Sequence, residues 1–204
     1  MGPESTVLLG PYLDKRRPAK DKHTAIIRSW NQKEMALAIG SISKAAKAFD
    51  ITAPDKAWRS KGSQARGNLI ANLVIETFEN TKKFRLETAD GRGFGSGYPD
   101  AIGHIDGIGG VLVELKATKS WNTKDSNRRV LLSSVQKSLK MLKTVNGLLP
   151  LHLILTAIHD ESGKVITLRF DFLQRESEVT FREEISTSHK LLSKSPQNAF
   201  IVEA

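Results

Sequence analysis

The chain has 204 residues and no cysteine, which excludes disulfides, thiolate nucleophiles and cysteine-built zinc sites. Its five histidines are scattered, and none belongs to an HxxxH or HExxH pair, so a histidine-built zinc site is not expected. No apolar run approaches the roughly 20 residues that a membrane helix needs, and the N-terminus lacks a signal-peptide pattern. We therefore expect a soluble, cytoplasmic protein with no membrane partner.

Positive charge is abundant. The 31 Lys and Arg residues outnumber the 22 Asp and Glu residues, which gives a formal net charge of +9 at pH 7. Between Lys116 and Lys143, eight basic residues accompany one acid, Asp125. This concentration indicates a polyanionic partner, most often nucleic acid. The alternative is a solvated, lysine-rich surface.

Hydrophobic periodicity predicts helices and strands that interleave along the chain. Helical spacing of apolar residues predicts helices over about 25–49, 63–80 and 130–145. Alternating or continuous apolar runs predict strands over about 84–88, 99–106, 111–117, 150–158, 164–173 and 199–204. The expected fold class is α/β, with a mixed central sheet flanked by helices.

Three segments are expected within a single domain. Residues 1–60 contain a basic arm and a helical segment that Gly40 is expected to divide, and residues 61–175 contain the core. Residues 176–204 are expected to form a charged, weakly helical extension packed on the same domain, with the last short strand at its end.

The stretch "GYPDAIGHIDGIGGVLVELKAT" (97–118) places charged residues in an apolar context. Glu114 and Lys116 are one residue apart on a predicted strand, so their side chains share one face of the sheet. Their neighbours are apolar on both faces, which is typical of a buried strand and weakens the alternative of a surface ion pair.

The pairing of this strand with the preceding one decides which aspartate joins them. A turn centred on Ile108 puts Asp100 opposite Lys116, and Asp100 then shares the face of Glu114. A turn centred on Gly110 instead puts Asp106 opposite Glu114. The glycines permit either register, and in both an Asp, a Glu and a Lys converge. Each aspartate also has a plain interpretation as a turn residue.

Such a trio has a defined chemical use. Two carboxylates can hold Mg²⁺ through oxygen ligands and leave coordination sites for water and a phosphate. The metal lowers the pKa of the water and neutralises charge on the phosphate, and a lysine can position the water or stabilise that charge. The combination indicates phosphodiester hydrolysis.

The residues "YPD" (98–100) and "ELK" (114–116) resemble the signature of the PD-(D/E)xK nuclease superfamily. The predicted order helix–strand–strand–strand–helix–strand over about 63–158 is similar to the αβββαβ core of that superfamily. Within it, "SGYPDAI…VELKAT" most resembles type II restriction endonucleases. The resemblance therefore implies a restriction-endonuclease-like fold and a metal-dependent endonuclease.

The resemblance also implies roles for individual residues. Asp100 and Glu114 would bind the catalytic Mg²⁺, Lys116 would assist the attacking water, and Leu115 would lend its backbone carbonyl to the metal. Asp106 is the second choice for the metal-binding aspartate.

Many members of the superfamily add a glutamate from the first core helix. Glu76 is the best placed candidate and Glu79 the second, although a solvated helix position is the simpler interpretation. Gln136 on the later helix is a candidate contact to the site or to DNA, and an exposed helix glutamine is the equal alternative.

The partners implied are double-stranded DNA and a second copy of the chain, because cutting two strands with one site per chain usually requires a homodimer. The expected source is a prokaryotic cell or a phage. Basic and aromatic residues after the catalytic strand are the candidate DNA contacts. They are Lys119, Trp121, Lys124, Arg128, Arg129 and Lys137.

Two other functions stay open at this point. One is a structure-specific nuclease of recombination, repair or a phage, with the same fold. The other is a non-catalytic DNA-binding protein, against which the two carboxylates argue because they would repel phosphate in a binding groove.

Overall fold

The computed structural model of the protein describes residues 4–11, 28–47, 49–88, 99–120, 148–182, 190–193 and 199–203. Within these ranges, six strands form a mixed sheet in the order β2-β3-β4-β5-β6-β9. The strands are β2 (Phe84–Thr88), β3 (Ala101–Ile105), β4 (Gly109–Thr118), β5 (Leu148–His159), β6 (Val165–Phe172) and β9 (Ala199–Glu203). The pair β4–β5 is parallel, and the other neighbours are antiparallel.

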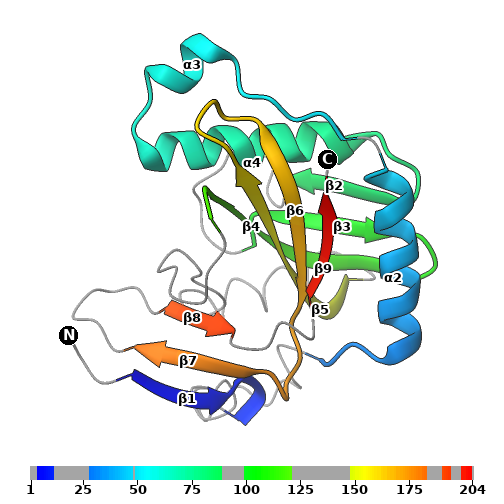
Figure 1. Cartoon of the computed structure of the whole chain (residues 1–204). Coiled ribbons are helices and arrows are strands. Elements are labelled where there is room, and N and C mark those ends of the chain that lie inside the picture. Colours follow the sequence, from blue (N-terminus) through cyan, green and yellow to red (C-terminus); the bar gives the residue numbers. More distant parts are fainter. Residues whose placement is uncertain are drawn as a thin grey trace.

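A second, three-stranded sheet has the order β1-β7-β8. It consists of β1 (Glu4–Leu8), β7 (Glu178–Arg182) and β8 (Lys190–Ser193), all antiparallel. Figure 1 shows this sheet at the end of the molecule opposite to helix α3 (Asp55–Arg59). The second sheet therefore pairs a strand near the N-terminus with two strands from the C-terminal part of the chain.

Two longer helices pack on one face of the main sheet. They are α2 (Gln32–Ala45) and α4 (Ser63–Glu79), and Figure 1 shows α4 running alongside β2. Alternate residues of each strand point to this face, as strand geometry requires. The resulting core includes Ile70, Val74 and Phe78 of α4 with Val111, Val113, Leu115, Leu153 and Leu155 of the sheet.

The α/β class and the mixed sheet flanked by helices are confirmed, and each predicted core strand is present. The helix predicted over 130–145 lies outside the described residues. Gly40 does not divide the N-terminal helix: α2 continues through it, and nothing lies within 4 Å of a Cβ built there. The helix begins after Asn31, whose side chain accepts a hydrogen bond from the Glu34 N–H.

The expectation for the two ends of the chain is partly wrong where they are described. Residues 4–8 form β1 and not an arm, because they pair with β7 from Glu4↔Arg182 to Leu8↔Glu178. Residues 178–182 and 190–193 are strands and not a helical extension, whereas the last short strand, predicted over 199–204, is present as β9. Strand pairing between distant segments overrides weak helical periodicity in these short pieces.

Candidate active site

The hairpin of β3 and β4 sets the register of the site. Pairs run from Ala101↔Val113 to Ile105↔Gly109, so the turn is centred on Gly107. Both predicted turn centres, Ile108 and Gly110, are therefore wrong. Gly107 has φ +80° and Gly109 φ +113°, a region that glycine enters without steric cost. The positive φ angles of Gly107 and Gly109 thus allow the tight turn between β3 and β4.

This register places Asp100 level with Glu114. One pairing step beyond Ala101↔Val113 is the pair Asp100 and Glu114, and residues opposite each other in a sheet project to the same face. Asp100 Oδ2 accepts a hydrogen bond of 2.9 Å from the Leu115 N–H. The Asp100 carboxylate is thereby held beside β4 just before β3 begins.

The Leu115 carbonyl faces the same side. The N–H and C=O of one residue in an antiparallel strand point toward the same neighbour, and the Leu115 N–H points to Asp100. A backbone oxygen and two carboxylates are therefore available at one place on the edge of β4.

Glu114 and Lys116 form a buried ion pair. Lys116 Nζ donates to Glu114 Oε1, and the side chains are 9% and 19% exposed for Glu114 and Lys116, respectively. Glu114 Oε2 is buried without a hydrogen-bond partner in the described part of the chain. A buried carboxylate oxygen without a donor is costly, and it marks a place for a cation or a water molecule.

The environment raises the pKa of the Glu114 carboxyl to about 7. Burial is the main cause, the positive charge of Lys116 opposes the rise, and the nearby Asp100 carboxyl adds to it. The two carboxyl groups thus repel one another in a poorly solvated place, which a bound cation would relieve.

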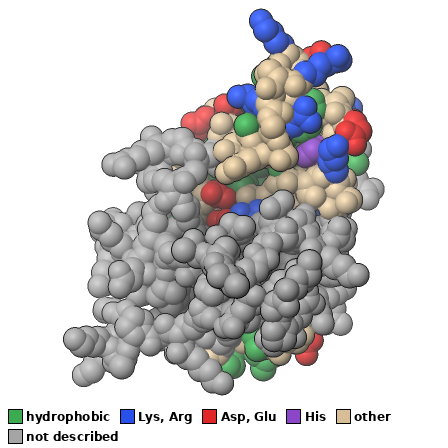
Figure 2. All heavy atoms as spheres, turned by 90° about the vertical axis from the view of Figure 1, so that its left-hand side faces the viewer, with side chains coloured by type: hydrophobic (Ala, Val, Ile, Leu, Met, Phe, Trp, Pro, Cys, Tyr) green, Lys and Arg blue, Asp and Glu red, His purple; other side chains and the backbone are tan. Residues whose placement is uncertain are grey.

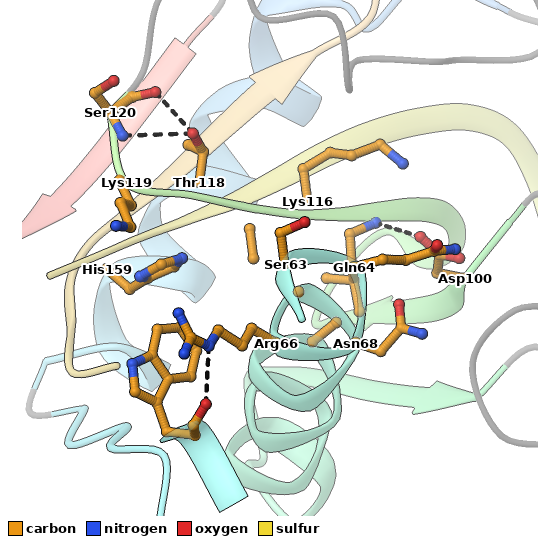
Figure 3. A pocket seen from close by; sticks show the side chains of 15 residues that line it. Ser63, Gln64, Arg66, Asn68, Asp100, Lys116, Thr118, Lys119, Ser120 and His159 are labelled. Carbon is orange, nitrogen blue, oxygen red and sulfur yellow. Dashed lines mark hydrogen bonds between the residues drawn. The ribbon is translucent and has the colours of Figure 1, made fainter. Parts of the chain in front are cut away.

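A cleft of about 760 Å³ opens beside these groups. Figure 3 shows Asp100 at one end of the cleft near Gln64 and Asn68 of α4, with the Lys116 side chain on the other side of the β4 ribbon. Other residues of the lining include Trp58 of α3, Arg66 of α4, Lys119 and Ser120 after β4, and His159 of β5. The cleft therefore runs between the start of α4 and the free end of β4.

These donors suit a hard divalent cation. Among the described residues no group of three or more His, Cys, Asp or Glu side chains could hold a metal ion. The two carboxylates, the unpartnered Glu114 Oε2 and the Leu115 carbonyl together make an incomplete, oxygen-only ligand set. Mg²⁺ is usually bound by one or two carboxylates, with water and phosphate completing its shell.

Asp106 does not belong to this group. It lies in the turn at the opposite end of the hairpin, is exposed, and forms an ion pair with Lys83. The pKa of its carboxyl is lowered by the hydrogen bond and the charge of Lys83. The structure thus brings Asp100, and not Asp106, to Glu114 and Lys116.

Glu76 and Glu79 are also placed elsewhere. Both are exposed and line a separate hollow with Glu87 and Thr88 of β2. Eight residues separate Glu76 from Asn68, which is about 12 Å along a helix. The first turns of α4, and not its later acidic part, therefore lie at the cleft.

The candidate DNA contacts are only partly described. Lys119 lines the cleft and forms a 2.5 Å ion pair with Glu161. The others lie outside the described residues: Trp121, Lys124, Arg128, Arg129, Gln136 and Lys137.

Sequence reasoning missed the polar residues at the start of α4. Ser63, Gln64, Gly67 and Asn68 recur at intervals of three and four, so they share one helical face. That polar stripe precedes the apolar part of the helix and was the available signal.

The wider surface around the cleft is basic. Lys56, Arg59 and Lys61 are exposed on and just after α3. Figure 2 shows several Lys and Arg side chains on the described part of this face, with Asp and Glu side chains among them, and an acidic and a basic side chain that meet in a hollow below. In the parts of the chain that are described, no helix is long and apolar enough to cross a membrane.

Comparison with known proteins gives no relative. No protein-family model matches the chain, and neither the curated proteins nor the solved structures contain a match.

Proposed function

We propose that this protein is a Mg²⁺-dependent endonuclease that hydrolyses phosphodiester bonds of double-stranded DNA, as a type II restriction enzyme of the PD-(D/E)xK superfamily does. One observation carries the proposal: Asp100 and Lys116 line a cleft, Glu114 lies beside both of them, and Glu114 Oε2 is buried without a partner among the described residues. Nothing in the packing of the sheet requires two carboxylates at this place.

The strand arrangement supports the same proposal. Helix α4 is followed by the antiparallel strands β2, β3 and β4, and β5 then lies parallel to β4. A parallel neighbour requires a crossover connection, and residues 119–147 supply it. This is the order expected for a restriction-endonuclease-like αβββαβ core.

Asp100, Glu114 and the Leu115 carbonyl would hold the metal ion. The chemistry that Mg²⁺ supplies when bound is charge neutralisation at the phosphate and a lower pKa for the attacking water. Asp100 is kept in position by the Leu115 N–H, and Glu114 by Lys116. The ligand oxygens are therefore preorganised by hydrogen bonds from β4 itself.

Lys116 would act on the reacting phosphate. Its ammonium lies beside the carboxylate pair and lines the cleft, where it can stabilise negative charge developing on phosphate oxygens or orient the attacking water. The amides of Gln64 and Asn68, across the cleft, can donate hydrogen bonds to the same phosphate or its neighbour.

The substrate and the oligomeric state follow from charge and symmetry. A net charge of +9 and a basic face around the cleft favour a polyanion. Cutting both strands of a duplex with one site per chain favours a homodimer, whose twofold axis would match a palindromic sequence.

The test is a cleavage assay with matched variants. Plasmid and phage DNA are incubated with the purified protein and Mg²⁺ or EDTA, beside Asp100→Asn and Glu114→Gln. We expect discrete Mg²⁺-dependent fragments, and a loss of at least about a hundredfold in rate in both variants. Asp106→Asn and Glu76→Gln remove equivalent carboxylates outside the site and are expected to cut at the parent rate.

Other outcomes have definite meanings. Cutting restricted to branched or nicked DNA would assign a structure-specific nuclease of repair, recombination or a phage. DNA binding without any cleavage would assign a non-catalytic binding protein. Equal activity of Glu114→Gln and the parent would overturn both nuclease assignments.

A further inference from the structure

Arg66 is a cation of the cleft whose guanidinium is held in a fixed position. Its Nε donates a 2.8 Å hydrogen bond to the Trp58 carbonyl oxygen, and its Cζ lies 5.0 Å from the centroid of the Trp58 ring. Figure 3 shows the guanidinium against the indole, toward the end of the cleft where His159 lies. The hydrogen bond uses Nε, so the terminal nitrogens are left to other partners.

No carboxylate pairs with Arg66 in the described part of the chain, although other arginines there have such partners. The pairs are Arg28–Glu34, Arg59–Asp55, Arg85–Glu87 and Arg169–Asp171. A guanidinium fixed in a cleft without a counter-charge is suited to an anionic ligand, because a planar fork of donors matches the oxygens of a phosphate.

The support beneath Arg66 is itself rigid. Trp58 is 3% exposed, its Nε1 donates to the Glu161 carbonyl at 2.8 Å, and its ring meets His159 edge to face at 4.9 Å. Gly163 lies so close that a Cβ there would come within 2.7 Å of the indole. The guanidinium therefore needs little further ordering when a ligand arrives, which lowers the entropic cost of binding.

The cleft also separates Arg66 from the carboxylate pair. Arg66, Asp100 and Lys116 all line it, and Figure 3 shows Arg66 and Asp100 at different ends of the cleft. A DNA strand that follows the cleft would thus meet Arg66 at another backbone phosphate than the one at the carboxylate pair.

We infer that Arg66 is the binding site for a second backbone phosphate of the DNA strand being cut. The inference rests on the proposed function, since it takes the strand to be the ligand of the whole cleft. The contact would position the strand without reading its sequence, as phosphate contacts do. Arg66 is therefore a substrate-positioning residue rather than a catalytic one.

The experiment measures DNA binding in a background that cannot cut. A short random-sequence duplex is titrated at several salt concentrations with the Glu114→Gln protein, and with the same protein carrying Arg66→Ala, Arg66→Lys or Arg85→Ala. For Arg66→Ala we expect about tenfold weaker binding. We also expect the slope of log K against log salt to flatten by about 0.9.

The two remaining variants separate charge from geometry. Arg66→Lys keeps the charge and loses the fixed fork, so its slope is expected to match the parent while its affinity falls. Arg85 is an exposed arginine of β2 that pairs with Glu87 outside the cleft lining, so its variant is expected to bind as the parent does. Thermal unfolding of each variant reports whether the fold is intact.

The outcomes distinguish this inference from the proposed function. If the folded Arg66→Ala protein kept the parent's slope of log K against log salt, Arg66 would not bind a phosphate, even if the parent cuts DNA. A flatter slope in a protein that never cuts would uphold the phosphate site and remove the nuclease assignment. Absence of any DNA binding by the parent would overturn both.

Discussion

At the scale of single residues, two of the buried polar atoms that lack a hydrogen-bond partner among the described residues lie on the face of the sheet that carries the site. They are Glu114 Oε2 and the hydroxyl of Thr156, which is 1% exposed. Thr156 pairs with Lys116 in the parallel register of β4 and β5, so both side chains point to one face. Unsatisfied groups of this kind cost stability, and proteins keep them mainly where function requires a local polar environment.

Thr156→Val is therefore expected to stabilise the protein. Valine has the same shape and no hydroxyl, so the substitution removes the unsatisfied group and should raise the free energy of unfolding by about 1 kcal/mol. For a chain of this size that corresponds to about 2–4 °C in Tm, measured by thermal and urea unfolding.

The control for this substitution is Thr77→Val. The Thr77 hydroxyl donates a 2.7 Å hydrogen bond to the Leu73 carbonyl within α4. Its removal is expected to leave stability unchanged or to lower it slightly. A loss of stability in Thr156→Val would show that the Thr156 hydroxyl forms a hydrogen bond in the folded protein. The hydroxyl would then not lower the free energy of unfolding.

At the scale of elements, the strands were predictable because their apolar runs are long and clearly bounded. The run "VLVELKA" marks β4, and the run "LHLILTAI" marks β5, whatever the rest of the chain does. The convergence of an aspartate with Glu114 and Lys116 was likewise predictable, since either expected turn in "DGIGG" brings one beside them, but the choice between Asp100 and Asp106 was not.

The details of pairing were not predictable. The turn "DGIGG" offers three glycines, and only the folded chain decides that Gly107 is its centre. The sequence predicted that α4 is a helix, but it did not predict which turn of that helix lies beside β4: the turn with Gln64 and Asn68, or the later turn with Glu76. Strands β1, β7 and β8 depend on pairing between the two ends of the chain, which no local pattern reveals.

Helix α3 and the β5–β6 turn form a single packed unit, on which the position of Arg66 depends. Gly163 has φ +88°, and a Cβ there would come within 2.7 Å of the Trp58 ring and 3.0 Å of Ala53. Gly163→Ala is expected to lower the free energy of unfolding by about 1–3 kcal/mol and to weaken DNA binding, because Trp58 must move. Urea unfolding and the duplex titration measure the two effects.

Gly40→Ala provides the matched comparison. Gly40 lies inside α2 with open space around it, so alanine there should raise stability by about 0.5–1 kcal/mol and leave DNA binding unchanged. If Gly163→Ala were as stable as the parent, the turn would have to accommodate the methyl group, and the rigid support argued for Arg66 would be absent.

At the scale of the whole molecule, the chain has an excess of positive charge, whereas the candidate site carries two carboxylates. The formal net charge is +9, and Asp100, which lines the cleft, lies beside Glu114. On the proposed function, the two carboxylates without a cation would oppose the attraction between the basic chain and DNA. The site would then accept a polyanion only once a cation has neutralised it.

This arrangement predicts that Mg²⁺ stabilises the folded protein through Asp100 and Glu114. An ion that binds only the folded state adds about 2.7 kcal/mol at a hundred times its Kd, or several degrees in Tm for a chain of this size. Thermal unfolding in Mg²⁺ and in KCl of equal ionic strength measures the effect without any DNA. The rise is expected in the parent and in Glu76→Gln, and it should be lost in Glu114→Gln and Asp100→Asn. An equal rise in Glu114→Gln would place the ion elsewhere on the molecule and leave the carboxylate pair without the role assigned to it.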